Sequence, residues 1–176
     1  MAPDGMQQGS GAMRSGMQPG GPMQPGPMQP GMMGDHTMDF VTKAAQSDEF
    51  EKSEGLLAER RSHNPHVKKF AAMMVSAHTK TTMGLKKAIA EGHVKTAVAT
   101  KLDARRQGMI DNLRASSGAE FDKRYVAQQI AAHHETLDLM KGYAEHGHND
   151  ALKDAASKTA PLVKSHLEMA KALPGA

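Results

Sequence analysis

One turn and the helix after it decide the fold: residues 63–78 read HNPHVKKFAAMMVSAH. Asn64 is a favourable helix N-cap and Pro65 suits the first helical position, so this pair ends one helix and begins the next. The apolar residues that follow recur every three or four positions and lead to a histidine: Val67, Phe70, Met74 and His78. This spacing is typical of an amphipathic helix with one buried face. We therefore predict a helical hairpin around this turn.

Similar signals along the chain predict further helices and no strands, because no segment alternates apolar and polar residues with period two. The predicted helices cover about residues 38–62, 65–91, 100–115, 118–146 and 150–173. Their expected N-caps are Thr37, Asn64, Ser117 (in a capping box with Glu120) and Asn149 or Asp150. Tight turns join the first two and the last two helices, whereas residues 93–117 form a long connection that carries the short helix. Two hairpins joined by a long crossover are typical of a ferritin-like four-helix bundle, so we predict an all-α fold of that kind.

The N-terminal segment differs in composition from the rest. Residues 1–40 hold 9 of the 15 Met, 9 of the 17 Gly and 6 of the 9 Pro. Such a segment buries too little apolar surface to offset the entropy of ordering it. We therefore predict a disordered tail over residues 1–37 and a folded bundle over residues 38–176.

The tail repeats the phrase Met-Gln-Pro-Gly at residues 17–20, 23–26 and 28–31. One interpretation is a flexible linker. The other is a soft-ligand site for copper, or an oxidant sink, because thioethers bind Cu(I) and oxidise reversibly. The candidate copper ligands are Met17, Met23, Met28, Met32, Met33 and His36.

The composition of the whole chain excludes several classes of function. Cysteine is absent, which removes disulfide scaffolds, thiolate metal sites and cysteine nucleophiles. Aromatic residues make up 3% of the chain and the net charge of +3 contains no dense basic block, so we expect no nucleic-acid partner. No apolar stretch is long enough for a transmembrane helix, and none reads as a signal-peptide core.

Each long predicted helix carries an ionisable residue on its apolar face: Glu51, His78, His133 and His166. Counted from the hairpin turns, their heights along the bundle differ by roughly 4–5 Å in the first hairpin and 7–8 Å in the second. One carboxylate and three imidazoles can therefore meet, a ligand set suited to Zn, Cu, Fe or Ni. We expect the three histidines to be mostly buried, with at least one within hydrogen-bond reach of Glu51 or Asp48.

The same four residues also fit a purely structural interpretation, a buried polar network in which the carboxylate orients the imidazole protons. Neither interpretation implies a catalysed reaction. A ferritin-type di-iron site is not predicted, because it needs two Glu-x-x-His motifs and the chain has one, from Glu145 to His148.

Two pairs of histidines flank the predicted turns, His63 and His66 at one and His146 and His148 at the other. Solvated turn residues are the simple interpretation. If both turns lie at the same end of the bundle, as we expect for two hairpins, these residues form a candidate surface metal site.

Four phrases of the sequence resemble the bacterial family called domain of unknown function 4142. They lie at residues 40–51 (FVTKAAQSDEFE), 67–78 (VKKFAAMMVSAH), 117–126 (SGAEFDKRYV) and 160–170 (APLVKSHLEMA). The resemblance covers about residues 38–176 and implies a ferritin-like helical bundle, exported to the periplasm or cell surface, with no established reaction. It also implies that the four buried ionisable residues named above stand where the family carries the same residue types.

From the resemblance we expect a non-enzymatic, exported helical protein with a role in the cell envelope or in stress. The alternative is a transition-metal-binding protein, with copper at the Met-rich tail or Zn, Cu or Fe at the buried cluster of Glu51 and three histidines.

Overall fold

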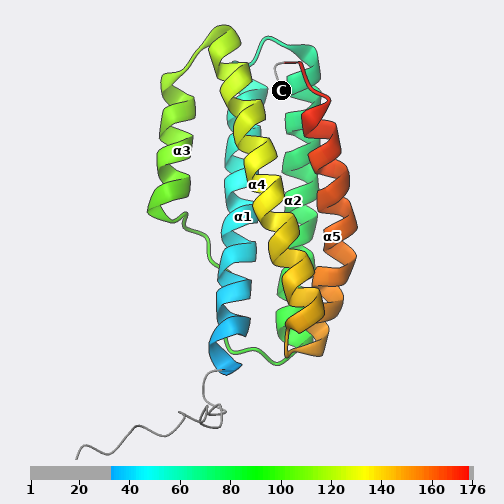
Figure 1. Cartoon of the computed structure of the whole chain (residues 1–176). Helices are drawn as coiled ribbons and strands as arrows, with labels where there is room; N and C mark the ends of the chain where they lie inside the picture. The colour runs from blue at the N-terminus through cyan, green and yellow to red at the C-terminus, as the bar shows by residue number, and fades with distance from the viewer. Residues whose placement is uncertain (1–32, 175–176) are drawn as a thin grey trace, which may run out of the picture.

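Five helices are present in the computed structural model, which describes residues 33–174 (Figure 1). They are α1 (Met33–Arg61), α2 (Pro65–Glu91), α3 (Ala104–Ala115), α4 (Gly118–His146) and α5 (Asp150–Lys171). The described part of the chain is all-α, as the sequence predicts, and α2 has the bounds expected from its cap and its terminal glycine.

Asparagine side chains cap two of the helices in the predicted way. The Asn64 side-chain oxygen accepts a hydrogen bond from the backbone N–H of His66 at 2.9 Å, and Pro65 is the first residue of α2. The Asn149 side-chain oxygen accepts from the backbone N–H of Leu152 at 3.1 Å. Each cap satisfies a backbone donor that has no partner within its helix.

Two other predicted caps are wrong. Helix α1 begins at Met33, so Thr37 lies inside it, and the Thr37 hydroxyl is 2.9 Å from the Tyr143 hydroxyl on α4. Ser117 does precede α4, but its side chain makes no capping hydrogen bond, so the predicted capping box does not form.

The four long helices pack in a ring. Helix α1 packs against α2 and α4 packs against α5, and these two hairpins meet through α1 with α4 and α2 with α5. In Figure 1 α1 and α5 run upward while α2 and α4 run downward. The connection after α2 crosses the lower end and leads to α3, which runs upward along the outside of the bundle, so α4 starts at the upper end.

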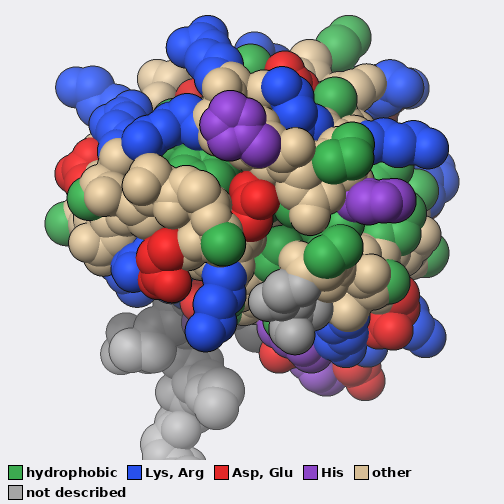
Figure 2. All heavy atoms as spheres, turned by 90° about the horizontal axis from the view of Figure 1, so that it is seen from above, with side chains coloured by type: hydrophobic (Ala, Val, Ile, Leu, Met, Phe, Trp, Pro, Cys, Tyr) green, Lys and Arg blue, Asp and Glu red, His purple; other side chains and the backbone are tan. Residues whose placement is uncertain are grey.

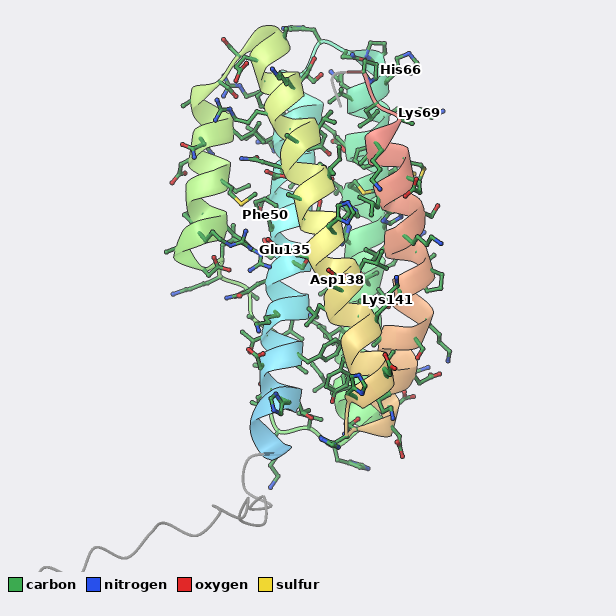
Figure 3. The ribbon with its side chains drawn as sticks, in the orientation of Figure 1. Phe50, His66, Lys69, Glu135, Asp138 and Lys141 are labelled. Atoms are coloured by element: carbon green, nitrogen blue, oxygen red, sulfur yellow. The ribbon has the colours of Figure 1, made fainter. Side chains whose placement is uncertain are left out.

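Helix α3 lies outside the ring, against α1 and α4. Phe50 of α1, Ile110 of α3 and Ala132 of α4 form a small apolar cluster there. Arg105 of α3 also pairs with Glu135 of α4 at 2.7 Å; Figure 3 labels Phe50 and Glu135 on the side of the ring that faces α3. These contacts hold the crossover to the bundle.

The two larger apolar clusters of the core lie one toward each end of the bundle, and a smaller one, formed by Leu137, Val163 and Leu167, joins α4 to α5. The lower cluster is formed by Phe40, Val41, Ala44, Ala45, Leu85, Ala88, Ile89, Met140, Tyr143, Leu152 and Ala156. The upper cluster is formed by Ala58, Val67, Phe70, Ala71, Met74, Leu113, Phe121, Tyr125, Val126 and Ala170. Between them the ring is filled by buried polar side chains, Asp48, Glu51, Glu54, His78, Gln129, His133 and His166, which we call the polar layer.

A glycine sets the close approach of α1 to α2. A Cβ atom on Gly55 would lie 2.7 Å from Val75 Cγ2 and 3.0 Å from the Ala71 carbonyl oxygen. Both distances are shorter than ordinary van der Waals contact. The absence of a side chain at this position therefore holds α1 and α2 at the distance that brings the polar layer together. None of the helices in residues 33–174 is both long and apolar enough to cross a membrane.

Candidate metal centre

Three histidines from three helices meet in the polar layer: His78 of α2, His133 of α4 and His166 of α5. Their side chains are 2%, 1% and 8% exposed. Their ring centroids lie 5.7 to 5.8 Å apart, and one ligand atom from each lies within 4.8 Å of the others. The predicted burial and meeting of these residues is confirmed, and we call them the histidine triad.

Asp48 fixes the orientation of His78. Its Oδ1 atom lies 2.8 Å from His78 Nδ1, which confirms the expected contact with a carboxylate of α1. The hydroxyl of Thr81 donates to Oδ1 at 2.7 Å and that of Thr82 donates to Oδ2 at 2.9 Å, so the carboxylate is itself held in place. With the Nδ1 proton directed at Asp48, neutral His78 keeps its lone pair on Nε2, which is buried and has no hydrogen-bond partner among the described residues.

A backbone carbonyl fixes His133 in the same way. Its Nδ1–H donates to the Gln129 carbonyl oxygen, one helical turn earlier, at 2.8 Å. Burial lowers the pKa of His133 to about 4, and the hydrogen bond to Gln129 only partly opposes that effect. The ring is therefore neutral at neutral pH, with its lone pair on Nε2, and this atom too has no partner among the described side chains.

His166 completes the triad from α5. Its Nδ1 atom is buried without a hydrogen-bond partner in the described part of the chain. Burial, and after it the neighbouring His78 and His133, lowers the pKa of His166 to about 4. Each of the three rings thus keeps one buried nitrogen that has no hydrogen-bond partner among the described residues.

Carboxyl groups of α1 lie beside the triad. Glu51 Oε1 is 3.4 Å from His133 Nδ1, on the side of the ring away from the unpartnered Nε2. Burial raises the pKa of Glu51 to about 7. The four residues expected from the sequence to form one ligand set therefore fall into two groups. The three histidines have ligand atoms close to one another, whereas Glu51 contacts the Nδ1 side of His133.

A second buried glutamate adjoins the first. Glu54 accepts a hydrogen bond from Gln129 Nε2 at 2.8 Å, and its pKa is raised well above the usual value, first by burial and then by the charge of Glu51. Gln129 therefore serves the layer twice, because its side chain binds Glu54 and its carbonyl oxygen binds His133.

The donor set of the triad fits a first-row transition metal. Neutral imidazole is a ligand for Zn, Cu, Fe and Ni. A tetrahedral ion with metal–nitrogen bonds of about 2.0–2.1 Å places its nitrogen ligands roughly 3.4 Å apart. The three ligand atoms lie within 4.8 Å of one another, so binding such an ion would require them to move closer by up to about 1.4 Å. Three protein ligands leave a fourth coordination position open.

The comparisons with known proteins identify the family. The family model for a domain of unknown function, DUF4142, matches residues 22–173. The chain belongs to the DUF4142 family. Neither the curated proteins nor the solved structures compared with the chain gave a match. The DUF4142 match begins at residue 22 and not at about 38, so it includes part of the Met-rich segment that we expected to lie outside the family.

Two members of the polar layer of this DUF4142 chain were missed from the sequence. Glu54 lies three residues after Glu51, and Gln129 lies four residues before His133, so both spacings follow the helical repeat. For this helix only Glu51 was expected on the apolar face, with Asp48 near it, so Glu54 was missed. The i, i+3 pair of glutamates was the signal that pointed to a larger acidic group.

The candidate copper ligands of the tail fall mostly outside the described residues. Met17, Met23, Met28 and Met32 lie there, as does the side chain of Met33. His36 is exposed at the start of α1, where it lines a hollow together with His146 and His148.

The expectation that both hairpin turns lie at the same end is wrong. The α1–α2 turn is at the upper end and the α4–α5 turn is at the lower end (Figure 1). His66 lies at the upper end in Figure 3, and Figure 2, which looks down on that end, shows histidine side chains on its surface. The four turn histidines are therefore two separate pairs, because the crossover carries the chain back up before α4 begins.

Proposed function

We propose that this DUF4142 protein binds one transition-metal ion through His78, His133 and His166. The observation that carries the proposal has two parts: each histidine keeps one buried ring nitrogen without a hydrogen-bond partner among the described residues, and one ligand atom of each lies within 4.8 Å of the others. The proposal favours the metal-binding interpretation of the sequence over the structural one.

The energetics of burial support this choice. A buried polar group that lacks a partner costs about 1–3 kcal/mol, and the polar layer carries this cost at the three ring nitrogens as well as at oxygens of Glu51, Glu54 and Gln129. The polar layer satisfies the other nitrogen of His78 and of His133 while leaving one nitrogen free on each. A single ion at the centre of the triad would satisfy all three free nitrogens at once.

The surroundings of the triad also resemble those of metal-binding histidines in general. Such residues donate their second ring N–H to a carboxylate or a backbone carbonyl, which fixes the tautomer and raises the basicity of the ligand. The Asp48 carboxylate is the acceptor for His78, and the Gln129 carbonyl oxygen is the acceptor for His133. Glu51 adds a carboxyl group that can offset the charge of an ion.

Metal analysis of the full chain, purified without a polyhistidine tag, tests the proposal. We expect one equivalent of Zn or Cu per chain after incubation with the metal and removal of the excess. The His133→Ala variant is expected to lose it, and His134→Ala is the matched control because this neighbour on α4 is exposed. Circular dichroism shows whether each variant keeps its helices. Wild-type protein that stays metal-free after incubation with Zn, Cu and Fe would contradict the proposal.

We also propose that the four long helices form a ferritin-like bundle and that the protein works in the periplasm or at the cell surface. The two hairpins and the long crossover support the first proposal. The second proposal, with a role in the cell envelope or in stress, follows the expectation that the resemblance of the sequence carries. Fractionation of cells that express the native gene tests the location; recovery in the cytoplasmic fraction alone would contradict it.

A further inference from the structure

A groove runs along the surface between α2 and α5, which lie side by side at the right of Figure 1. Its volume is about 580 Å³. Small residues on both helices keep it open: Ser76, Ala77, Gly84, Ala88, Ala151 and Ala155. Two larger apolar side chains, Met73 and Leu162, also line it.

The groove reaches the histidine triad. His166 is one of its lining residues and is the most exposed of the three histidines, although nine-tenths of it is buried. Its Nδ1 atom has no hydrogen-bond partner among the described residues. The groove therefore connects solvent to a polar residue that has an unused ligand atom.

A second residue that lines the groove also contacts the carboxylate that orients His78. Thr81 lines the groove and donates to the Asp48 carboxylate that holds His78. On other sides the triad is enclosed. The Phe70 ring lies 6.4 Å from that of His133, and buried carboxyl groups of α1 stand behind His78 and His133. An incoming molecule thus approaches the triad between α2 and α5.

The charge along the groove favours an anion. Of its three lysines, Lys158 pairs with Asp154 at 2.5 Å and Lys87 lies 3.6 Å from Glu91, so these charges are offset locally. Lys80, two residues after His78, has no ion-pair partner among the described residues and lines the groove. An unpaired cation beside a passage raises the local concentration of small anions.

We propose that this groove is the passage through which a small anion reaches the fourth coordination position of a metal ion held by the triad. This inference rests on the proposed function, because three histidine ligands leave one coordination position of a four-coordinate ion open. The class of ligand is a small monoanion such as a carboxylate, and azide is a suitable probe.

Azide titration of the Co(II)-loaded full chain tests the inference, because the visible spectrum of Co(II) reports changes among its ligands. We expect a saturable spectral change with azide in the wild type. Ala77→Phe, which places a ring in the groove beside His78, should weaken azide binding at least tenfold, whereas Ala72→Phe, on the exposed face of α2, should not. Lys80→Gln should weaken it by a few-fold and Lys86→Gln should leave it unchanged.

The outcomes separate the two proposals. If Co(II) does not bind, or binds equally well to His133→Ala, the proposed function fails and the inference fails with it. If Co(II) binds in a His133-dependent manner and azide leaves the spectrum unchanged, the inference alone is overturned. Equal azide affinity in wild type and Lys80→Gln, together with equal affinity in Ala77→Phe, also overturns it. If Ala77→Phe fails to fold, the azide affinities of Lys80→Gln and Lys86→Gln test the inference on their own.

Discussion

Asp48 Oδ1 lies 2.8 Å from His78 Nδ1, and both side chains are buried. This contact leaves the second ring nitrogen of His78 without a hydrogen-bond partner among the described residues, so Asp48 would act through His78 on a metal ion held by the triad, without touching the ion. In Asp48→Asn the oxygen that receives the Nδ1 proton remains, but its charge is lost. We expect the Zn affinity, measured by competition with a chromophoric chelator, to fall roughly 10- to 100-fold. Asp138→Asn, at an exposed position on α4 (Figure 3), is the matched control and should bind Zn like the wild type.

Metal binding should stabilise the fold, because an ion that binds only the folded chain shifts the unfolding equilibrium. At a free Zn concentration of about 100 times the dissociation constant, the gain is about 2.7 kcal/mol. We expect a rise of several degrees in the melting temperature of the wild type and of His134→Ala, measured by circular dichroism, and none in His166→Ala. An equal rise in all three proteins would place the bound ion elsewhere.

Stability without metal should depend on pH through Glu51. Its pKa is about 7 in the folded protein, against 4.5 in the unfolded chain, so the folded state keeps the proton where the unfolded state has lost it. Stability from this group is therefore complete at low pH and declines as the pH rises from 4.5 to about 7. The shifts of His133 and His166 act in the opposite direction, since stability from neutral histidines grows as the pH rises.

A comparison with Glu51→Gln isolates the carboxyl group from the histidines. Relative to wild type, this variant should gain about 2.5 kcal/mol in unfolding free energy between about pH 5 and about pH 8. Urea denaturation of the metal-free proteins at both pH values measures the difference. A difference that stays constant with pH would show that Glu51 titrates normally in the folded protein.

Much of the fold follows from local patterns in the sequence. Helical periodicity and the caps at Asn64 and Asn149 depend on neighbouring residues alone, and both caps are confirmed. The start of α1 was missed because Thr37 is a good cap by type, while its hydroxyl actually faces Tyr143 on α4. That contact depends on how distant helices pack, which local patterns do not reveal.

The candidate site was predictable where it follows the helical repeat. His78, His133 and His166 lie on apolar stripes, so their meeting could be inferred before the helices were placed. The separation of Glu51 from the ligand atoms of the triad could not be predicted, because it depends on the rotation of each helix about its axis and on which ring nitrogen faces inward. The position of the turns also needed the path of the crossover, which the lengths of the segments did not determine.

The contact at Gly55 predicts a position that is sensitive to even the smallest side chain. In Gly55→Ala the added Cβ would lie 2.7 Å from Val75 Cγ2, so α1 and α2 must separate. We expect a loss of about 1–3 kcal/mol in unfolding free energy, by urea denaturation. Gly142→Ala is the control, because a Cβ there meets nothing within 4 Å and alanine favours the helix, so stability should be equal or slightly higher.

The Met-rich segment gives a prediction separate from the triad. If it binds Cu(I), the full chain with Met17, Met23 and Met28 replaced by leucine should lose Cu(I) affinity in a competition titration. Its Zn binding at the triad should stay the same. Unchanged Cu(I) affinity would favour the linker interpretation of residues 1–37.

The polar layer between the two apolar clusters also limits how the helices can slide. When a helix shifts by one turn, about 5.4 Å, apolar side chains at either end meet other apolar side chains, and only their sizes and shapes oppose the shift. In the layer, such a shift of α5 would take His166 away from His78 and His133 and bury it among apolar groups. The histidines therefore add a penalty of a different kind, the burial of an unpaired polar ring, to any sliding of α5 along the bundle.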